Sequence, residues 1–175
     1  LLSRLLFVWF IKEKNLVPDE FFDYKHIEAH IFQDNKEIHN KSKYYHIILQ
    51  NLFFAALNCK QGERQFTKDS THQNVTHLMR QKELIKDPEA FVKRIEEVVP
   101  FMNGGLFDCL DKPDPVKKGK QGGAIINYYD GFSRVYANRP VVPDYVFFGR
   151  QEHVDLSKVK DDSKSLPVVE LSPTA

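Results

Sequence analysis

The sequence predicts a mainly α fold with a small β element near the C-terminus (α+β), and three observations support this class. Apolar residues recur at steps of three and four through most of the first two-thirds of the chain, as they do on one face of a helix. Proline followed by acidic residues occurs where two of these segments begin. Glycine-rich turns and β-prone runs gather after residue 100. We therefore expect helices first and a few short strands last.

The first two helices are predicted over residues 1–14 and after Pro18. Residues 1–14 are apolar on nearly every side, which is typical of a buried core helix, and they fall short of the ~20 residues that span a bilayer. Pro18 opens a first turn with two acids, which the helix dipole favours. A stripe at helical spacing follows it, made of Phe21, Tyr24, Ile27 and Ile31.

Two more helices are predicted over residues 42–58 and 88–99. The first has Ser42 as a candidate cap and a single apolar face, made of Tyr45, Ile48, Leu49, Leu52, Phe53, Ala56 and Leu57. The second has Asp87 as N-cap and Pro88 in its first position, and Pro100 closes it. Its apolar face contains Phe91, Val92, Ile95, Val98 and Val99.

Beyond residue 100 the sequence predicts turns and short strands. Residues 124–129 form a β-prone run before the turn dipeptide at 130–131. Val141, Val142 and residues 145–148 predict one or two further strands, which Pro143 interrupts. We divide the chain into a helical domain with a small β part over residues 1–150 and a polar tail or linker over residues 151–175.

Charge and cysteine content limit the possible functions. The 25 Lys and Arg residues against 24 Asp and Glu residues exclude a globally basic nucleic-acid wrapper. Cys59 and Cys109 are too few for a disulfide framework or a four-thiolate zinc site, and they fit a reducing cytoplasm. No apolar run predicts a membrane partner. Because the chain starts inside an apolar segment without Met, we expect a piece of a longer protein.

Two patterns imitate metal sites. His26 and His30 lie four apart on one predicted helix face, but no third ligand is evident, so an ordinary histidine pair is the better interpretation. A metal-dependent nuclease needs Pro-Asp, a gap, and then acid-x-Lys. One match combines Pro143-Asp144 with residues 162–164, but its acid-x-Lys element falls in the polar tail. The other combines Pro18-Asp19 with residues 23–25, but the gap between its two elements is too short. We predict no catalytic residue and no metal ligand.

A basic cluster is the remaining candidate site. Lysines gather in a Gly- and Pro-containing loop at 112–120, and arginines follow it, with tyrosines between them. Lysines in such a loop can contact DNA phosphates without reading sequence, although an ordinary solvated loop remains the alternative. The candidate phosphate contacts are Lys117, Lys118, Lys120, Arg134 and Arg139.

Five segments in one order resemble the type IIG restriction-modification enzymes, in which nuclease and adenine-specific DNA methyltransferase share one polypeptide. The segments, which together cover about residues 1–150, are 1–14, 45–58, 100–107 (Pro-Phe-Met-Asn-Gly-Gly-Leu-Phe), 130–133 and 142–149 (Val-Pro-Asp-Tyr-Val-Phe-Phe-Gly). The resemblance implies the region between the nuclease and the methyltransferase core. Residues 151–175 match nothing in the family.

The resemblance implies a non-catalytic connector domain within a bacterial, cytoplasmic phage-defence enzyme. The parent would use S-adenosylmethionine and Mg²⁺, whereas this chain lacks the family's cofactor loop and Asn-Pro-Pro motif and should bind no cofactor. Its expected partners are the nuclease and methyltransferase domains of the same polypeptide and, weakly, the DNA backbone. Two alternatives stay open: a metal-dependent nuclease fragment, and a protein-interaction domain of a phage-defence methyltransferase that has no nuclease.

Overall fold

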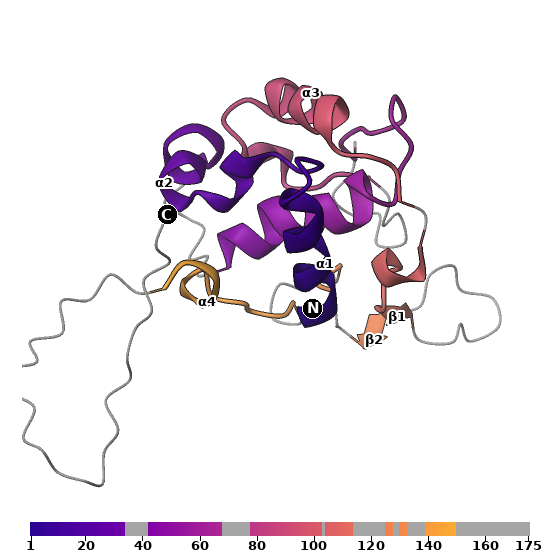
Figure 1. Ribbon diagram of the computed structural model, residues 1–175. Coiled ribbons are helices and arrows are strands. Elements are labelled where there is room, and N and C mark those ends of the chain that lie inside the picture. The colour runs from indigo at the N-terminus through magenta and orange to yellow at the C-terminus, as the bar shows by residue number, and fades with distance from the viewer. Residues whose placement is uncertain are drawn as a thin grey trace, which may run out of the picture.

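Helices dominate the computed structural model, which confirms the mainly α prediction (Figure 1). The structure describes residues 1–33, 42–67, 78–102, 104–113, 125–127, 130–132 and 139–149. In this part of the chain, no helix has both the length and the apolar character needed to cross a bilayer.

The first helix, α1 (Leu2–Lys12), is buried along one face and exposed along the other. Arg4, Val8 and Ile11 point into the core because steps of four and three place them on one side of the helix. The opposite side is apolar but exposed. The prediction of an all-round buried helix is therefore wrong, because the described residues bury only one side of α1.

The segment after Pro18 forms three short pieces instead of one helix. They are η1 (Asp19–Phe22), α2 (Tyr24–His26) and η2 (Ile27–Ile31). The break falls at Asp23, whose backbone is extended and whose carboxylate accepts the N–H groups of Lys25 and His26. Asp23 thus acts as an N-cap and starts a new helical turn.

The predicted helix over 42–58 is present as two adjoining pieces, η3 (Tyr44–Leu49) and η4 (Asn51–Ala56), joined through Gln50; we call this unit the central helix. Its hydrogen bonds reach five residues back, as from Leu57 N–H to the Leu52 carbonyl at 2.9 Å. Every residue from 44 to 57 is buried, including three polar ones. The single apolar face predicted from sequence underestimates this burial, because other segments cover the remaining sides.

The N-terminus of the central helix is capped from a distant segment. The carboxylate of Asp144 accepts the Tyr44 N–H at 2.9 Å, across 100 residues of sequence. The Ser42 hydroxyl, the predicted cap, instead accepts the Val142 N–H at 3.0 Å. These reciprocal bonds attach the segment before α4 to the start of the central helix.

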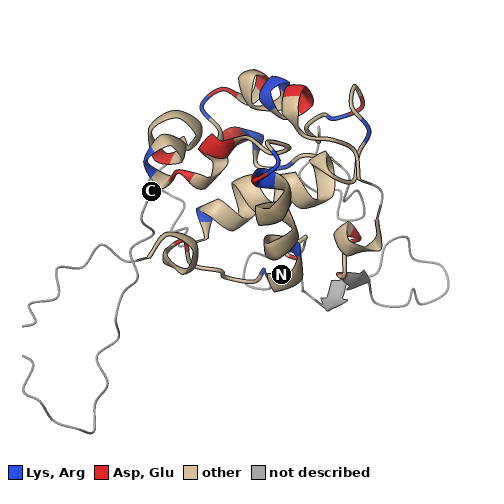
Figure 2. Cartoon of the chain, in the orientation of Figure 1, with Lys and Arg blue, Asp and Glu red and all other residues tan. Residues whose placement is uncertain are grey.

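Helix α3 (Pro88–Val98) follows its sequence signals closely. The Asp87 carboxylate accepts the Ala90 N–H at 2.9 Å, Pro88 occupies the first position, and Phe91 and Ile95 are buried. The short η5 (Lys82–Leu84) precedes it. Figure 2 shows acidic and basic positions along α3, whereas the central helix is almost free of charge.

The C-terminal part of the described chain contains η6 (Gly105–Phe107), β1 (Lys112–Pro113), β2 (Ile125–Asn127) and α4 (Tyr145–Phe148). The two strand segments pair antiparallel over only two to three residues. Such a short pairing does not amount to the predicted β element, which stays a prediction. Residues 145–148 are helical, and the strand predicted there is wrong, because Pro143 and Asp144 begin a helical turn. The proposed tail, 151–175, lies outside the described residues.

The other helices lie around the central helix (Figure 1), and aromatic rings connect several of them. Phe107 of η6 lies 5.6 Å from Phe7 of α1, and Phe21 stacks on Phe91 of α3 at 5.4 Å between ring centroids. Tyr44 meets Phe148 of α4 at 4.6 Å. Because each contact links segments far apart in sequence, the core is one continuous unit.

Candidate functional site

A buried ion pair between Arg4 of α1 and Asp130 lies beside the central helix. Arg4 Nη1 and Asp130 Oδ1 are 2.6 Å apart, and each side chain is only 5% exposed. The guanidinium also donates to the carbonyls of Leu106 and Asp108, at 2.7 and 2.6 Å, and lies over the ring of Phe54. A buried charge requires such pairing, since desolvation without it costs several kcal/mol.

Asp130 joins three separate parts of the chain. Its second carboxylate oxygen accepts the Leu110 N–H at 2.6 Å. Its backbone carbonyl accepts from the Gln50 amide at 2.8 Å and from the Tyr45 hydroxyl at 3.2 Å, both in the central helix. Together with Arg4, these bonds connect α1, the central helix and the loop after η6 through one residue.

Asp111 extends this network by accepting two backbone hydrogen bonds. Its two carboxylate oxygens accept the N–H groups of Asp130 and Phe132, at 2.6 and 2.7 Å. Cys109, Asp111 and Asp130 place possible ligand atoms within 4.8 Å of one another. Backbone N–H groups and Arg4 already occupy the carboxylates, however, and burial raises the pKa of the Cys109 thiol to about 12. The cluster fits a structural network better than a metal centre, which would need the thiolate.

Gly131 lets the next part of the network pack closely. It has φ of +86°, and a Cβ there would lie 3.2 Å from His46 Cε1 and 3.3 Å from Pro140 Cδ. Burial lowers the pKa of His46 to about 4, and the nearby charge of Arg139 contributes to this shift. His46 is therefore neutral at physiological pH and acts as a core residue.

Arg139 is the one predicted phosphate contact in the described part of the chain. It is half-buried, and its charge acts on both His46 and Arg80. With the Gln81 amide in the orientation that satisfies both of its atoms, Gln81 accepts from Arg139 Nη1 at 3.3 Å. Arg80 is buried over the ring of Phe132, and desolvation lowers its pKa to about 10. Arg80, Arg139 and His46 thus lie close to the turn at residues 131–132.

The other predicted phosphate contacts, Lys117, Lys118, Lys120 and Arg134, lie outside the described residues. The His26 and His30 rings are 4.6 Å apart between centroids, and His30 is exposed. Within the part of the chain that the structure describes, no third metal ligand joins this pair.

The acids of the two nuclease-like patterns serve as helix caps or surface residues where they are described. Asp144 caps the central helix, and burial raises its pKa to about 6. Asp23 caps α2, while Asp19 is exposed and lies 3.6 Å from Lys12. The segment 162–164 lies outside the described residues. Each of these described acids therefore has a backbone N–H group or a lysine as its neighbour.

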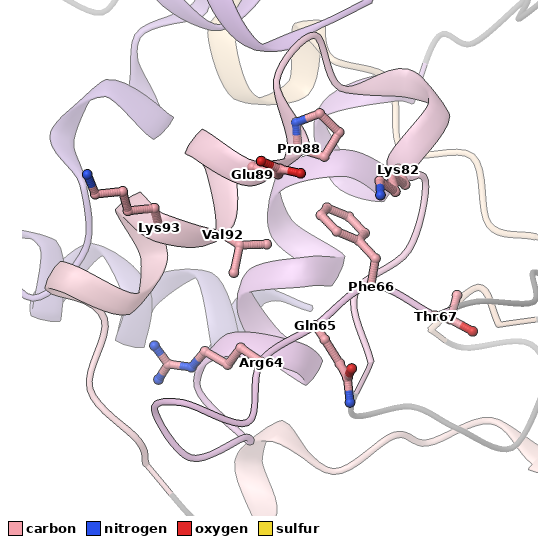
Figure 3. Close-up of a pocket in the computed structure, with 9 residues that line it drawn as sticks. All are labelled: Arg64, Gln65, Phe66, Thr67, Lys82, Pro88, Glu89, Val92 and Lys93. Carbon is pink, nitrogen blue, oxygen red and sulfur yellow. The ribbon is translucent and has the colours of Figure 1, made fainter.

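An open groove of about 690 Å³ lies between residues 64–67 and α3 (Figure 3). Its charged lining consists of Arg64, Lys82, Lys93 and Glu89. In Figure 3 the Arg64 guanidinium points away from Phe66 and toward the C-terminal part of α3, where Nη1 donates to the Ile95 carbonyl at 3.1 Å. Arg64 therefore supports α3 more than it supplies charge to the groove.

Sequence reasoning missed Arg4, Asp130 and Gln50, which form the centre of the network. Arg4 had a usable signal, because it is the only charged residue among the first eleven, and a lone charge in an apolar segment needs a buried partner. Asp130 resembled an ordinary turn residue, and Gln50 interrupts no apolar pattern. The spacing of residues along the sequence could not predict that Arg4 and Gln50 both bond to Asp130.

The chain is similar to part of a restriction-modification protein. It is 25% identical over 136 residues to a provisionally named type II restriction enzyme and methyltransferase of Methanocaldococcus jannaschii. The match covers 75% of this chain but only 9% of that relative. No family model matches the chain, and no solved structure matches it either.

Proposed function

We propose that this chain is the non-catalytic connector of a type IIG-like restriction-modification protein. It would hold a nuclease at a set distance from the methyltransferase that recognises the DNA. The observation that carries the proposal is the buried link through Asp130, which ties α1, the central helix and the loop after η6 together. The similarity to a restriction enzyme and methyltransferase supplies the context.

A spacer must resist bending, and three features of the described core suit that task. The central helix is buried on all sides, its N-terminus is capped by Asp144, and its middle is bonded to Asp130 through Gln50. The two hydrogen bonds restrain the helix through segments that lie 100 and 80 residues away in sequence. Close-packed interiors transmit displacement instead of absorbing it.

The connector role is tested by mapping cut positions in the full-length protein. The Arg4→Met variant removes the link to Asp130 and should broaden the distribution of cut positions on plasmid DNA, while methyl transfer to the same DNA continues. Arg94→Met is the matched control, because it breaks an exposed ion pair with Glu20 on the surface. An unchanged cut distribution in a folded Arg4→Met protein would refute a spacer role for the link.

The nuclease alternative needs a separate assay on the 175-residue chain. Asp144→Asn keeps an oxygen that accepts the Tyr44 N–H but removes the charge that a metal would need. Asp162→Ala tests the second acid of the same pattern. Mg²⁺-dependent nicking that both substitutions abolish would favour the nuclease fragment over the connector.

We also propose that the basic residues of the sequence pattern, Lys117, Lys118, Lys120, Arg134 and Arg139, contact the DNA backbone. Support comes from Arg139, which is only half-buried and lies close enough to Arg80 for the two charges to interact. Anisotropy of a labelled non-specific duplex across a salt series tests it. Replacing the three lysines by alanine should lower the salt slope by about one per lost phosphate contact, whereas Lys60→Ala with Lys93→Ala should not change it. Identical slopes in all three proteins would refute the contact.

The protein-interaction alternative is decided by the sequence of the full reading frame. An acid-and-lysine nuclease set upstream supports the connector. Its absence, with an Asn-Pro-Pro motif downstream, favours an interaction domain of a methyltransferase without nuclease.

A further inference from the structure

The side of α1 that faces away from the core is apolar and exposed. We call it the outer face and define it by Leu2, Leu6, Trp9 and Phe10, whose exposed fractions are 71, 65, 55 and 59%. Large side chains of this kind are usually at least half-buried in a soluble domain. Four of them on one helix therefore form a surface that needs an explanation.

Helical geometry makes the outer face one continuous stripe. Positions 2, 6, 9 and 10 fall within about 100° of the helix circumference at 3.6 residues per turn. The buried positions, Arg4, Val8 and Ile11, lie on the opposite side. No charged side chain interrupts the stripe, since Arg4 is the only charged residue before Lys12 and its side chain is 5% exposed.

Cations border the stripe at its C-terminal end. Lys12 Nζ lies 5.1 Å from the ring centroid of Trp9, and Lys14 Nζ lies 5.8 Å from that of Phe10. An apolar centre bounded by charged residues is typical of a protein interface. Trp9 also contacts Phe22 of η1 by its edge, at 5.9 Å, so the ring is held in place before any partner arrives.

The exposed area decides between possible partners. With aromatic side chains of 150–250 Å² and leucines somewhat smaller, the outer face exposes about 500 Å². A stable complex between independent proteins buries about 800 Å² on each side. Domains within one chain associate through roughly 300–750 Å² on each side, because the covalent connection raises their effective concentration. The outer face is thus the right size for a connected domain and small for a dimer of separate chains.

We propose that the outer face of α1 packs against an apolar surface of an adjoining domain in the same, longer polypeptide. This inference rests on the proposed function in one respect, that the chain acts as part of a larger protein. The match to only 9% of the relative leaves ample chain for such a domain. Docking along a helix that is itself joined to Asp130 would fix the adjoining domain to the rigid core.

The test compares oxidation of Trp9 by hydroxyl radicals in the full-length protein and in the 175-residue chain. Trp9 is the only tryptophan of the chain, so its peptide is identified directly by mass spectrometry. We expect its oxidation rate to fall roughly fivefold in the full-length protein, as the ring passes from half-exposed to interface-buried. An equal rate in both proteins would overturn the proposal.

Variants identify the surface responsible. In the full-length protein, Leu6→Glu should restore oxidation of Trp9. Val146→Glu is the matched control, because Val146 is also apolar, helical and 60% exposed, but lies on α4. Equal restoration by both variants would overturn the assignment to α1. The wild-type comparison does not depend on any variant, so a poorly folded variant leaves the proposal testable.

The remaining occupants give different results. Concentration-dependent dimers of the 175-residue chain, abolished by Leu6→Glu, would mean that a second copy covers the face. If anionic vesicles protect Trp9 from oxidation, but the full-length protein alone does not, the outer face binds a lipid surface. Either result would overturn the proposal. If Trp9 is protected in a full-length protein that carries neither nuclease nor methyltransferase, the docking stands and the connector function fails.

Discussion

Replacing Arg4 by methionine should remove a large part of the stability of this domain. Methionine preserves much of the aliphatic length but leaves Asp130 buried, with the Leu110 N–H as the remaining partner of its carboxylate. Two carbonyls, of Leu106 and Asp108, lose their donor as well. Breaking one side of a buried ion pair costs about 3–5 kcal/mol, against a total of about 5–15 kcal/mol for a typical domain.

Urea unfolding followed by circular dichroism measures this loss. With a slope of about 2–3 kcal/mol per molar urea, the midpoint should fall by about 1–2.5 M. The matched control is Arg94→Met, because Arg94 pairs with Glu20 on the surface, where the two side chains are 44 and 26% exposed. Exposed pairs contribute less than about 1 kcal/mol, so the control midpoint should move by less than about 0.5 M.

A double substitution separates charge burial from lost packing. Adding Asp130→Asn to Arg4→Met removes the unpaired charge, and part of the lost stability should return. If Arg4→Met alone shifts the midpoint no more than Arg94→Met does, the ion pair does not hold the fold as argued. If the double variant recovers nothing, the cost comes from packing and not from the buried carboxylate.

Three further predictions concern titration and backbone conformation. The pKa of Asp144 is about 6 in the folded state and lower when the chain is unfolded, so protonation of Asp144 favours folding. The wild-type protein should therefore become more stable through this group as the pH falls from 6 to 4. The Asp144→Asn variant, whose side chain still accepts the Tyr44 N–H, should lose that gain in thermal melts across this range. His46 acts in the opposite direction, because its pKa is about 4 in the folded state and acid therefore protonates this histidine first in the unfolded chain. The His46→Gln variant should lose less stability than the wild type between pH 6.5 and 4. An unchanged dependence of stability on pH would contradict the burial of His46 as a neutral group. Gly131→Ala should cost about 1–3 kcal/mol, and more than Gly62→Ala, since both have positive φ but only the Cβ at position 131 meets His46; equal losses on urea unfolding would refute the packing argument.

The candidate site shows where sequence reasoning works for this chain. The nuclease-like pattern at Pro143-Asp144 was given little weight, and in the structure its aspartate accepts a backbone N–H at the start of the central helix. Arg139 was predicted as part of a basic pattern, but its neighbour Arg80 was not, because 59 residues of sequence separate them. Local composition can indicate the kind of charge at a site without indicating which segment completes it.

Interactions within a few residues were determined by the sequence alone. Helix α3 begins and ends at its predicted signals because the Asp87 cap, Pro88 and the apolar spacing all act within one helical turn of one another. The core character of the central helix is likewise visible from its own residues. These signals act within one helical turn, so at α3 they do not depend on which distant segment packs against the helix.

Only the tertiary structure decided the pairing of Arg4 with Asp130, the capping of Tyr44 by Asp144, and which side of α1 is exposed. The first pair is separated by 126 residues, and the second by 100. A carboxylate accepts whichever donor the folded chain brings to it, and an apolar helix face is buried only where another element covers it. The spacing of residues along α1 predicts neither the partner of Arg4 nor the exposed side of the helix, because both depend on segments that meet only after folding.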